Sequence, residues 1–124
     1  MPVSLEQLRD AVERHGPVAY LLTVSDDVRP HAVSTPVGWD GDRLALDVGA
    51  RSQMNANGRP LVSLLWPPVE PDGYSLIVDG DALVTRDGVV LVIPTKAVLH
   101  RSAGGPDALS SACGSDCIPL TGDA

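Results

Sequence analysis

From Val18 onward the chain is a succession of short β-rich runs, and turn signals separate several of them. Asp40-Gly41-Asp42 and Thr85-Arg86-Asp87-Gly88 are typical of tight hairpins, which join antiparallel neighbours. Six antiparallel strands in so short a chain favour a small barrel over an open sheet. The sequence predicts these strands over residues 18–25, 31–39, 43–48, 61–66, 74–84 and 89–98.

Two helical segments accompany the predicted strands. Over residues 5–15, apolar side chains recur at helical spacing until Gly16-Pro17 ends the run. Ser4 and Gln7 have the spacing of a capping box, in which each side chain bonds the backbone N–H of the other residue. A short helix or helical turn is expected where residues 50–60 read ARSQMNANGRP. The predicted fold is therefore a mainly β, six-stranded antiparallel barrel with an N-terminal helix and a short helix between strands three and four.

Composition limits the size, partners and location of the protein. The chain has 124 residues, of which 44% are hydrophobic and 20% charged, as in a folded globular domain. Sixteen acidic residues against nine basic ones give a net charge of −7, which opposes binding to nucleic acid or to an anionic membrane. No apolar run approaches the roughly 20 residues of a membrane span, and the N-terminus lacks the order of a signal peptide. We therefore expect a cytoplasmic protein.

The core must be built almost without aromatic side chains. The chain has no Phe, two Trp and two Tyr, so Val, Leu and Ala have to fill the interior. A small core of this kind is often completed by association between copies. We therefore expect a homo-oligomer.

The last part of the chain, residues 103–124, is a tail of small and polar residues that follows the domain predicted over residues 1–102. It holds both cysteines, Cys113 and Cys117. This C-x3-C pair has no accompanying histidine cluster or further cysteines and so lacks the four ligands of a structural metal site, and we expect no metal. Exposed thiols are the simplest interpretation, and a tail that folds over a binding groove is the alternative.

The segment between the third and fourth strands carries the chemistry. Arg51, Ser52 and Gln53 are three side-chain donors together at the expected start of the short helix. Helix N-termini bind anions because their first N–H groups are unpaired and the helix dipole is positive there. The planar fork of an arginine suits phosphate oxygens. The alternative is structural: Arg51 and Arg59 would merely solvate a surface helix that Ser52 caps.

The order of these features resembles the pyridoxamine 5′-phosphate oxidase-like, FMN-binding split-barrel superfamily. The resemblance is carried by RPHAVSTPVGWDGDRLALDVGARSQMNANGRPLVSLLW (29–66), YSLIVDGDALV (74–84) and PTKAVLHR (94–101). Several short matches in the right order carry it, rather than one diagnostic motif. The resemblance implies a split barrel, a homodimer and a flavin in a groove between the two protomers.

The resemblance also implies a set of site residues. The strand over residues 33–37 would line the isoalloxazine ring, chiefly through main-chain groups, and residues 47–50 would pass close to the ribityl chain or the ring. The start of the short helix would hold the phosphate, Asn55 would brace that helix, and Trp66 could approach the site from the partner chain. The implied cofactor-binding residues are Val33, Ser34, Thr35, Pro36, Val37, Asp47, Val48, Arg51, Ser52, Gln53, Asn55 and Trp66.

One position departs from the family pattern and bears on the choice of cofactor. Many members have a second basic residue where this chain has Ser52. The alternative cofactor is a deazaflavin of the F-420 type, which related split barrels bind. Its longer anionic tail would favour a longer basic groove, whereas this chain has a single lysine, Lys96. FMN is therefore the expected cofactor, and the deazaflavin is the alternative.

No Ser-His-Asp or paired-carboxylate pattern is recognisable, so any activity would come from a bound cofactor. His31 opens the strand that would face the cofactor and is the candidate to contact a small-molecule substrate. The first hypothesis is an FMN-binding oxidoreductase that transfers hydride through the flavin. The second is a protein that binds or sequesters a flavin without catalysis. In a third, the barrel is purely structural.

Overall fold

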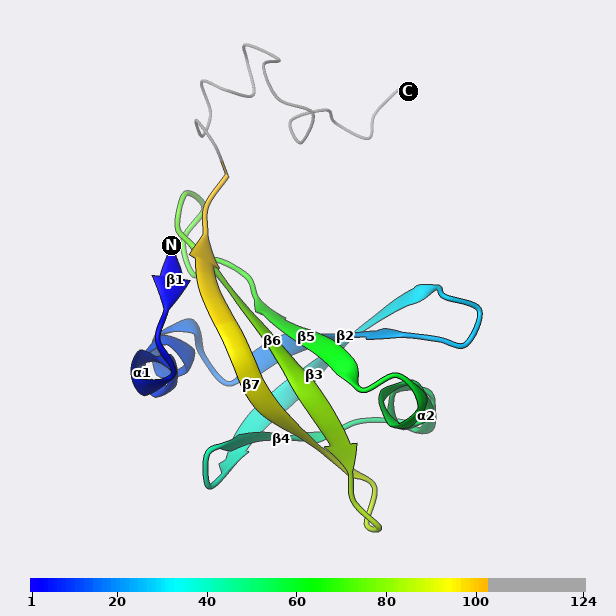
Figure 1. The fold of residues 1–124 in the computed structure, drawn as a ribbon. Coiled ribbons are helices and arrows are strands. Elements are labelled where there is room, and N and C mark those ends of the chain that lie inside the picture. Colours follow the sequence, from blue (N-terminus) through cyan, green and yellow to red (C-terminus); the bar gives the residue numbers. More distant parts are fainter. Residues whose placement is uncertain (103–124) are drawn as a thin grey trace, which may run out of the picture.

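The structure is a computed structural model that describes residues 1–102, and Figure 1 shows the arrangement of its elements. In chain order these are β1 (Pro2–Val3), α1 (Leu5–His15), β2 (Val18–Val24), β3 (Pro30–Asp40), β4 (Arg43–Asp47), α2 (Ala50–Gly58), β5 (Leu61–Trp66), β6 (Ser75–Val84) and β7 (Val89–His100). The predicted tail over residues 103–124, with Cys113 and Cys117, lies outside the described residues.

The strands form one antiparallel sheet that closes on itself. Their order is β1-β7-β4-β3-β2-β5-β6, and β6 pairs in turn with β7, which closes a six-stranded barrel. The predicted mainly β barrel with two helices is confirmed. The two-residue strand β1 was not predicted, because two residues are too few to show a period. Strand β1 pairs with residues 97–98 of β7. It lies along the same edge of β7 that pairs with β4 at residues 89–92.

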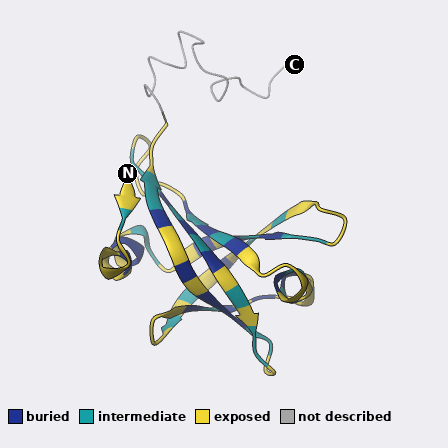
Figure 2. Ribbon diagram, in the orientation of Figure 1, coloured by how far each residue is buried: buried dark blue, intermediate teal, exposed yellow. Residues whose placement is uncertain are grey.

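The core fills the barrel and continues beneath α1. Buried and exposed residues alternate along the strands, as Figure 2 shows, because successive side chains of a strand point to opposite faces. Leu8, Ala11 and Val12 of α1 are buried in the same cluster. Among residues 1–102 the largest fully buried side chains are Trp66, Leu8, Leu21, Leu44, Leu46, Leu64 and Leu76.

Helix α1 is fixed at both ends by its own sequence. The Ser4 hydroxyl accepts from the Gln7 N–H at 3.2 Å, and the Gln7 side chain accepts from the Ser4 N–H at 3.4 Å, which forms the predicted capping box. At the other end, Gly16 takes φ 102°, a conformation that favours glycine. The indole N–H of Trp66 donates to the Gly16 carbonyl at 3.1 Å and ties this end to β5.

Along its second half, helix α2 is tied to β2 and to the turn that follows β2. The Asn55 amide donates to the Thr23 hydroxyl of β2 at 3.1 Å, and the Arg59 guanidinium donates to the Ser25 carbonyl at 3.1 Å. Its N-cap is Gly49, which offers no side-chain cap. The alternative in which Ser52 caps this helix is therefore wrong, because Ser52 lies inside the first turn.

The barrel is split beside the first half of β3. On one edge β3 pairs with β2 from Pro30 to Pro36, whereas on the other edge its pairing with β4 covers only Val37 to Asp40. Beyond that pairing, β4 ends at Asp47 and the chain turns into α2. The opening between the first half of β3 and the start of α2 is where the candidate site lies.

Candidate functional site

A groove of about 400 Å³ occupies this split. Its walls come from the first half of β3 and from the continuous segment that ends β4 and begins α2. The volume falls within the range of small-molecule sites. Its lining residues are His31, Val33, Ser34, Asp47, Val48, Gly49, Ala50, Arg51 and Ser52.

The edge of β3 beside the split offers main-chain groups at alternate residues. The Val37 N–H donates to the Pro17 carbonyl at 2.8 Å, on the side of β2. Because backbone groups of successive strand residues point to opposite edges, those of Ala32 and Ser34 point away from β2. Pro30 and Pro36 occupy the same alternate positions and have no N–H to offer. Between residues 30 and 36 this edge therefore presents two N–H donors.

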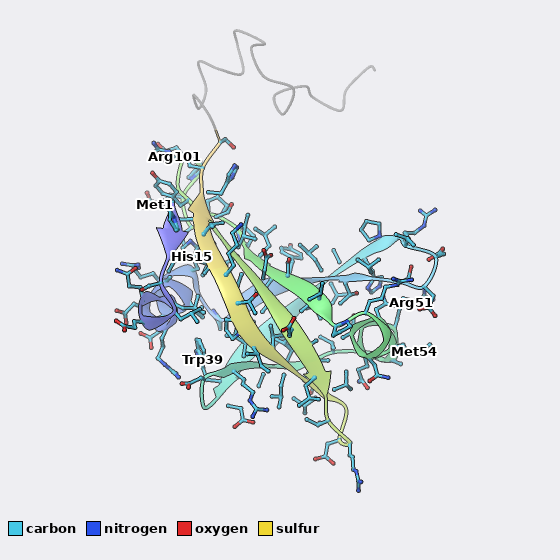
Figure 3. The ribbon with its side chains drawn as sticks, in the orientation of Figure 1. Met1, His15, Trp39, Arg51, Met54 and Arg101 are labelled. Carbon is cyan, nitrogen blue, oxygen red and sulfur yellow. The ribbon has the colours of Figure 1, made fainter. Side chains whose placement is uncertain are left out.

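The start of α2 supplies a second group of donors. The N-cap residue, Gly49, has no side chain that could accept hydrogen bonds from the N–H groups of the first turn. Ser52 is only 2% exposed and lines the groove, and Arg51 is exposed beside it. Figure 3 shows Arg51 on the side of α2 that lies toward the β2–β3 hairpin. A helix N-terminus with an arginine and a serine hydroxyl is suited to an anion.

Two further ionisable side chains line the same groove. His31 is half-buried, and its Nδ1 atom is buried with no hydrogen-bond partner among the described residues. Asp47 is exposed at the end of β4. The groove therefore combines several donors with one carboxylate acceptor. That combination is suited to a ligand that carries both an anionic group and groups that donate hydrogen bonds.

The structure brings together part of the predicted site set. Residues at 31, 33 and 34 on β3 meet residues at 47, 48, 51 and 52, although the two segments are separated by a hairpin in the sequence. Gly49 and Ala50 complete the lining. The resemblance implied that residues 47–50 pass close to the cofactor, but Gly49 was not identified as the N-cap of the helix. The available signal was the lack of a Ser, Thr, Asp or Asn side chain at the residue before the helix.

The remaining predicted residues lie outside the lining of the groove. Thr35 is buried and its hydroxyl donates to the Pro36 carbonyl at 2.9 Å, while Val37 packs against the core. The Gln53 amide donates to the Val48 carbonyl at 2.7 Å, so Gln53 braces the turn into α2.

Asn55 and Trp66 also have structural contacts within the chain. The Asn55 amide bonds to β2 and not to the groove. Trp66 is 0% exposed and its indole N–H donates to Gly16, beside α1. In this chain the side chain of Trp66 therefore offers no surface to a ligand.

A second hollow of about 470 Å³ lies over β2, β5, β6 and β7. Its polar wall includes the Ser63 hydroxyl, which donates to the Asp79 carboxylate at 2.6 Å. Nothing in the sequence predicted it, because its residues come from strands that are far apart in the chain. Within residues 1–102, no group of three or more His, Cys, Asp or Glu side chains could hold a metal ion. Neither described helix is long and apolar enough to cross a membrane.

Solved structures define the fold class. A putative pyridoxamine 5′-phosphate oxidase from Listeria innocua superposes with a TM-score of 0.67 at 20% identity, covering 80% of this chain and 100% of that one. A heme-binding protein from Mycobacterium smegmatis gives 0.63 at 15% identity over 84% of this chain and 57% of the other. An F420 reductase gives 0.54 at 21% identity over 68% and 91%. The resemblance to the pyridoxamine 5′-phosphate oxidase-like split barrels is confirmed at the level of the fold.

Curated relatives place the chain within a narrower group. Proteins of Mycobacterium bovis (Mb0449c) and Mycobacterium tuberculosis (MT0457), both described as uncharacterized, are each 41% identical to it over 134 residues. The match covers 94% of this chain and 93% of each relative. The chain belongs to the same family as these two mycobacterial proteins. No family model matches the sequence.

Proposed function

We propose that the groove binds a flavin-type cofactor, FMN before a deazaflavin, and that the protein is a flavin-dependent oxidoreductase. One observation carries the proposal: a helix start without a side-chain cap, bearing Arg51 and Ser52, opens into a groove beside an unpaired stretch of β3. A helix N-terminus of this kind is suited to a phosphate. The edge of β3 is suited to the planar, hydrogen-bonding ring at the other end of a flavin.

The residues of the groove fit FMN group by group. Arg51, the Ser52 hydroxyl and the first N–H groups of α2 would hold the phosphate. The main-chain groups of Ala32 and Ser34 would pair with the polar edge of the ring. Asp47 would accept hydrogen bonds from hydroxyl groups of the ribityl chain. The fit requires the phosphate to lie on the Arg51 side, because the Asp47 carboxylate repels an anion.

Bound FMN would supply the redox chemistry, the transfer of hydride to or from a small-molecule substrate. The chain's own part is to bind and orient the cofactor and to keep water from its reacting face. Besides Arg51, the ionisable side chains among the residues that line the groove are His31 and Asp47. Positioning rather than a dedicated acid–base pair is therefore the expected contribution of the protein.

A second candidate function is binding without turnover. The observation in its favour is that Arg51 is the one permanent cation among the lining residues, with Ser52 where a second base is usual in the family that the sequence resembles. A charge-assisted hydrogen bond is roughly twice as strong as a neutral one, so this site would hold FMN less tightly than a two-base site. A protein that stores or carries a flavin needs no substrate-binding residues.

The direct test is the chromophore of the full-length protein. We expect purified protein to carry, or to take up, FMN, identified by absorbance in the flavin bands and by mass. F420 or heme in its place would contradict the FMN proposal, and a colourless protein that ignores added FMN would end it. Turnover with a supplied reductant then separates an oxidoreductase from a storage protein.

Arg51→Ala provides the matched variant. Losing a charged contact to the phosphate should weaken FMN binding about tenfold or more, since such contacts contribute about 1.5–3 kcal/mol. Arg14→Ala is the control because Arg14 is exposed in the last turn of α1, which lies apart from α2 in Figure 1. Isothermal titration with FMN should show a loss in the first variant and none in the second. Equal affinities would remove Arg51 from the site.

We further propose a homodimer that closes the groove. The outward side of β2 and its neighbours is apolar over Val18, Tyr20, Leu22, Leu65 and Ile77, which we call the outer apolar face. Tyr20 is 43% exposed and pairs in register with Leu65 on one side and with Ser34, a groove residue, on the other. A second copy on this face would therefore lie next to the groove.

Tyr20→Glu tests the dimer, because a buried charge on the outer apolar face is costly. Sedimentation should show a monomer, and FMN affinity should fall with it. Leu5→Glu is the control, since Leu5 is 57% exposed on α1 and does not belong to that face. An unchanged dimer in Tyr20→Glu would place the interface elsewhere.

A further inference from the structure

His31 lies in the groove in a position that the contacts of the protein do not explain. It is paired across the strands with Thr23, and its side chain points to the same side of β3 as that of Thr35, which is buried. Because the split removes β4 from this part of β3, His31 borders the groove together with Arg51 and Ser52.

The two nitrogens of its ring are in different situations. Nδ1 is buried and has no hydrogen-bond partner among residues 1–102. A neutral imidazole carries one N–H and one bare nitrogen. Orphaned buried N–H groups are rarer than orphaned acceptors, so the bare nitrogen is the better occupant of the Nδ1 position. The hydrogen is then on Nε2, the nitrogen left for a ligand in the groove.

We propose that His31 is a specificity-determining residue of the anion site, with its Nε2–H donating to the phosphate of the bound flavin. This rests on the proposed function. Ser52 occupies the place where a second base is usual, and His31 brings the missing donor to the groove from a different element, β3. The charged groups facing His31 across the groove are the Arg51 guanidinium, which shares the phosphate, and the Asp47 carboxylate, which competes with it as an acceptor.

The proposal makes His31 a residue that distinguishes phosphorylated from unphosphorylated flavins. A contact with the phosphate affects FMN and leaves riboflavin, which has the same ring and ribityl chain, nearly unaffected. A contact with the ring or a purely structural role changes the affinity for both ligands alike. The ratio of the two affinities therefore reports on this residue more directly than either affinity.

The test compares His31→Asn with His31→Gln in the full-length protein. The amide nitrogen of Gln reaches about the position of Nε2, whereas that of Asn lies near the position of Nδ1. Fluorescence titrations with FMN and riboflavin should show that His31→Asn lowers the FMN-over-riboflavin affinity ratio about tenfold, the expected effect of one lost hydrogen bond to a charged group. His31→Gln should keep the ratio within about threefold of that of the parent protein.

Equal losses for both flavins, or an unchanged ratio in His31→Asn, would overturn the proposal. If the variants do not fold, ¹⁵N-imidazole spectra of the parent protein decide: an Nε2–H signal that moves with FMN and stays with riboflavin supports the proposal, and an Nδ1–H tautomer contradicts it. Failure of the proposed function gives a different result, since the parent protein would then not bind FMN at all. If the parent protein binds FMN but the affinity ratio is unchanged in His31→Asn, the proposed role of His31 is wrong and the proposed flavin site stands.

Discussion

The two helices of the protein begin in opposite ways. Helix α1 satisfies its first N–H groups with its own side chains, because Ser4 and Gln7 form a reciprocal capping box. Helix α2 begins after Gly49, which provides no side-chain acceptor. The free energy of capping typically amounts to about 1 kcal/mol. At α2 the glycine N-cap gives up only a few tenths of a kcal/mol relative to a good side-chain cap.

The same contrast holds for burial along the helices. Three apolar residues of α1 are buried against the barrel, so this helix is part of the core. In α2 the buried residues are Ser52 and Ala56, its second half is tied to the end of β2, and Gln53 braces the turn before its start. A helix with an open start that is held by its far end is suited to presenting donors to a ligand. The comparison therefore separates a helix that stabilises the fold from one that serves the site.

The largest expected effect comes from closing the start of α2. Gly49 has φ −73° and ψ 176°, and a side chain there would meet open space, so Gly49→Asp should fold. Its carboxylate would accept the first-turn N–H groups and repel the phosphate. We expect FMN affinity to fall about a hundredfold, corresponding to about 3 kcal/mol, while stability rises by a few tenths of a kcal/mol.

Gly49→Ala is the matched control for this variant. It adds a side chain at the same position without supplying an acceptor or a charge. FMN affinity should stay within about twofold to threefold of the parent value, as measured by isothermal titration. If the Ala variant loses as much affinity as the Asp variant, the space at Gly49 matters and the uncapped N–H groups do not.

The reverse experiment removes the cap of α1. Ser4→Ala breaks the capping box and should lower the free energy of unfolding by about 1 kcal/mol. For a domain of this size that corresponds to a fall in Tm of about 5 °C, measurable by circular dichroism. FMN affinity should not change, because α1 contributes no residue to the groove. A change in affinity would show that the two helices are not independent.

The difference between the helices explains which parts of the fold were predictable. The bounds of α1 match the structure because a capping box, a helical period and a terminal glycine are all local signals. The strand at residues 61–66 was also predicted correctly, from an apolar run bounded by turn residues. Strand β1 was missed, since its pairing with β7 depends on residues far away in the chain.

The candidate site was predictable only where it is continuous in the sequence. The segment around Arg51 was recognised because its donors are neighbours at a helix start. On β3, the resemblance placed residues 33–37 at the site, but the groove is lined by Val33 and Ser34 and not by Thr35 to Val37. The groove lies beside the part of β3 that does not pair with β4. Where that pairing ends depends on how the two strands meet in the fold and not on the local sequence. Trp66 shares the inward face of β5 with Val62 and Leu64, but Leu61 and Leu65 on the other face are apolar too, so the sequence did not show which face lies inward.

The smallest expected effect tests how α2 is held. Asn55→Ala removes the amide that donates to Thr23, whose side chain is 1% exposed, at a cost of about 1 kcal/mol. Alanine is the better helix former by about 0.6 kcal/mol, so the net loss of stability should be only a few tenths of a kcal/mol. FMN affinity should nevertheless fall about twofold to threefold, because the second half of α2 positions the donors at its start. Hydrogen exchange of the α2 amides, with the α1 amides as the internal reference, should speed up in α2 alone. Faster exchange in both helices would mean that Asn55 supports the whole barrel rather than the helix that carries the site.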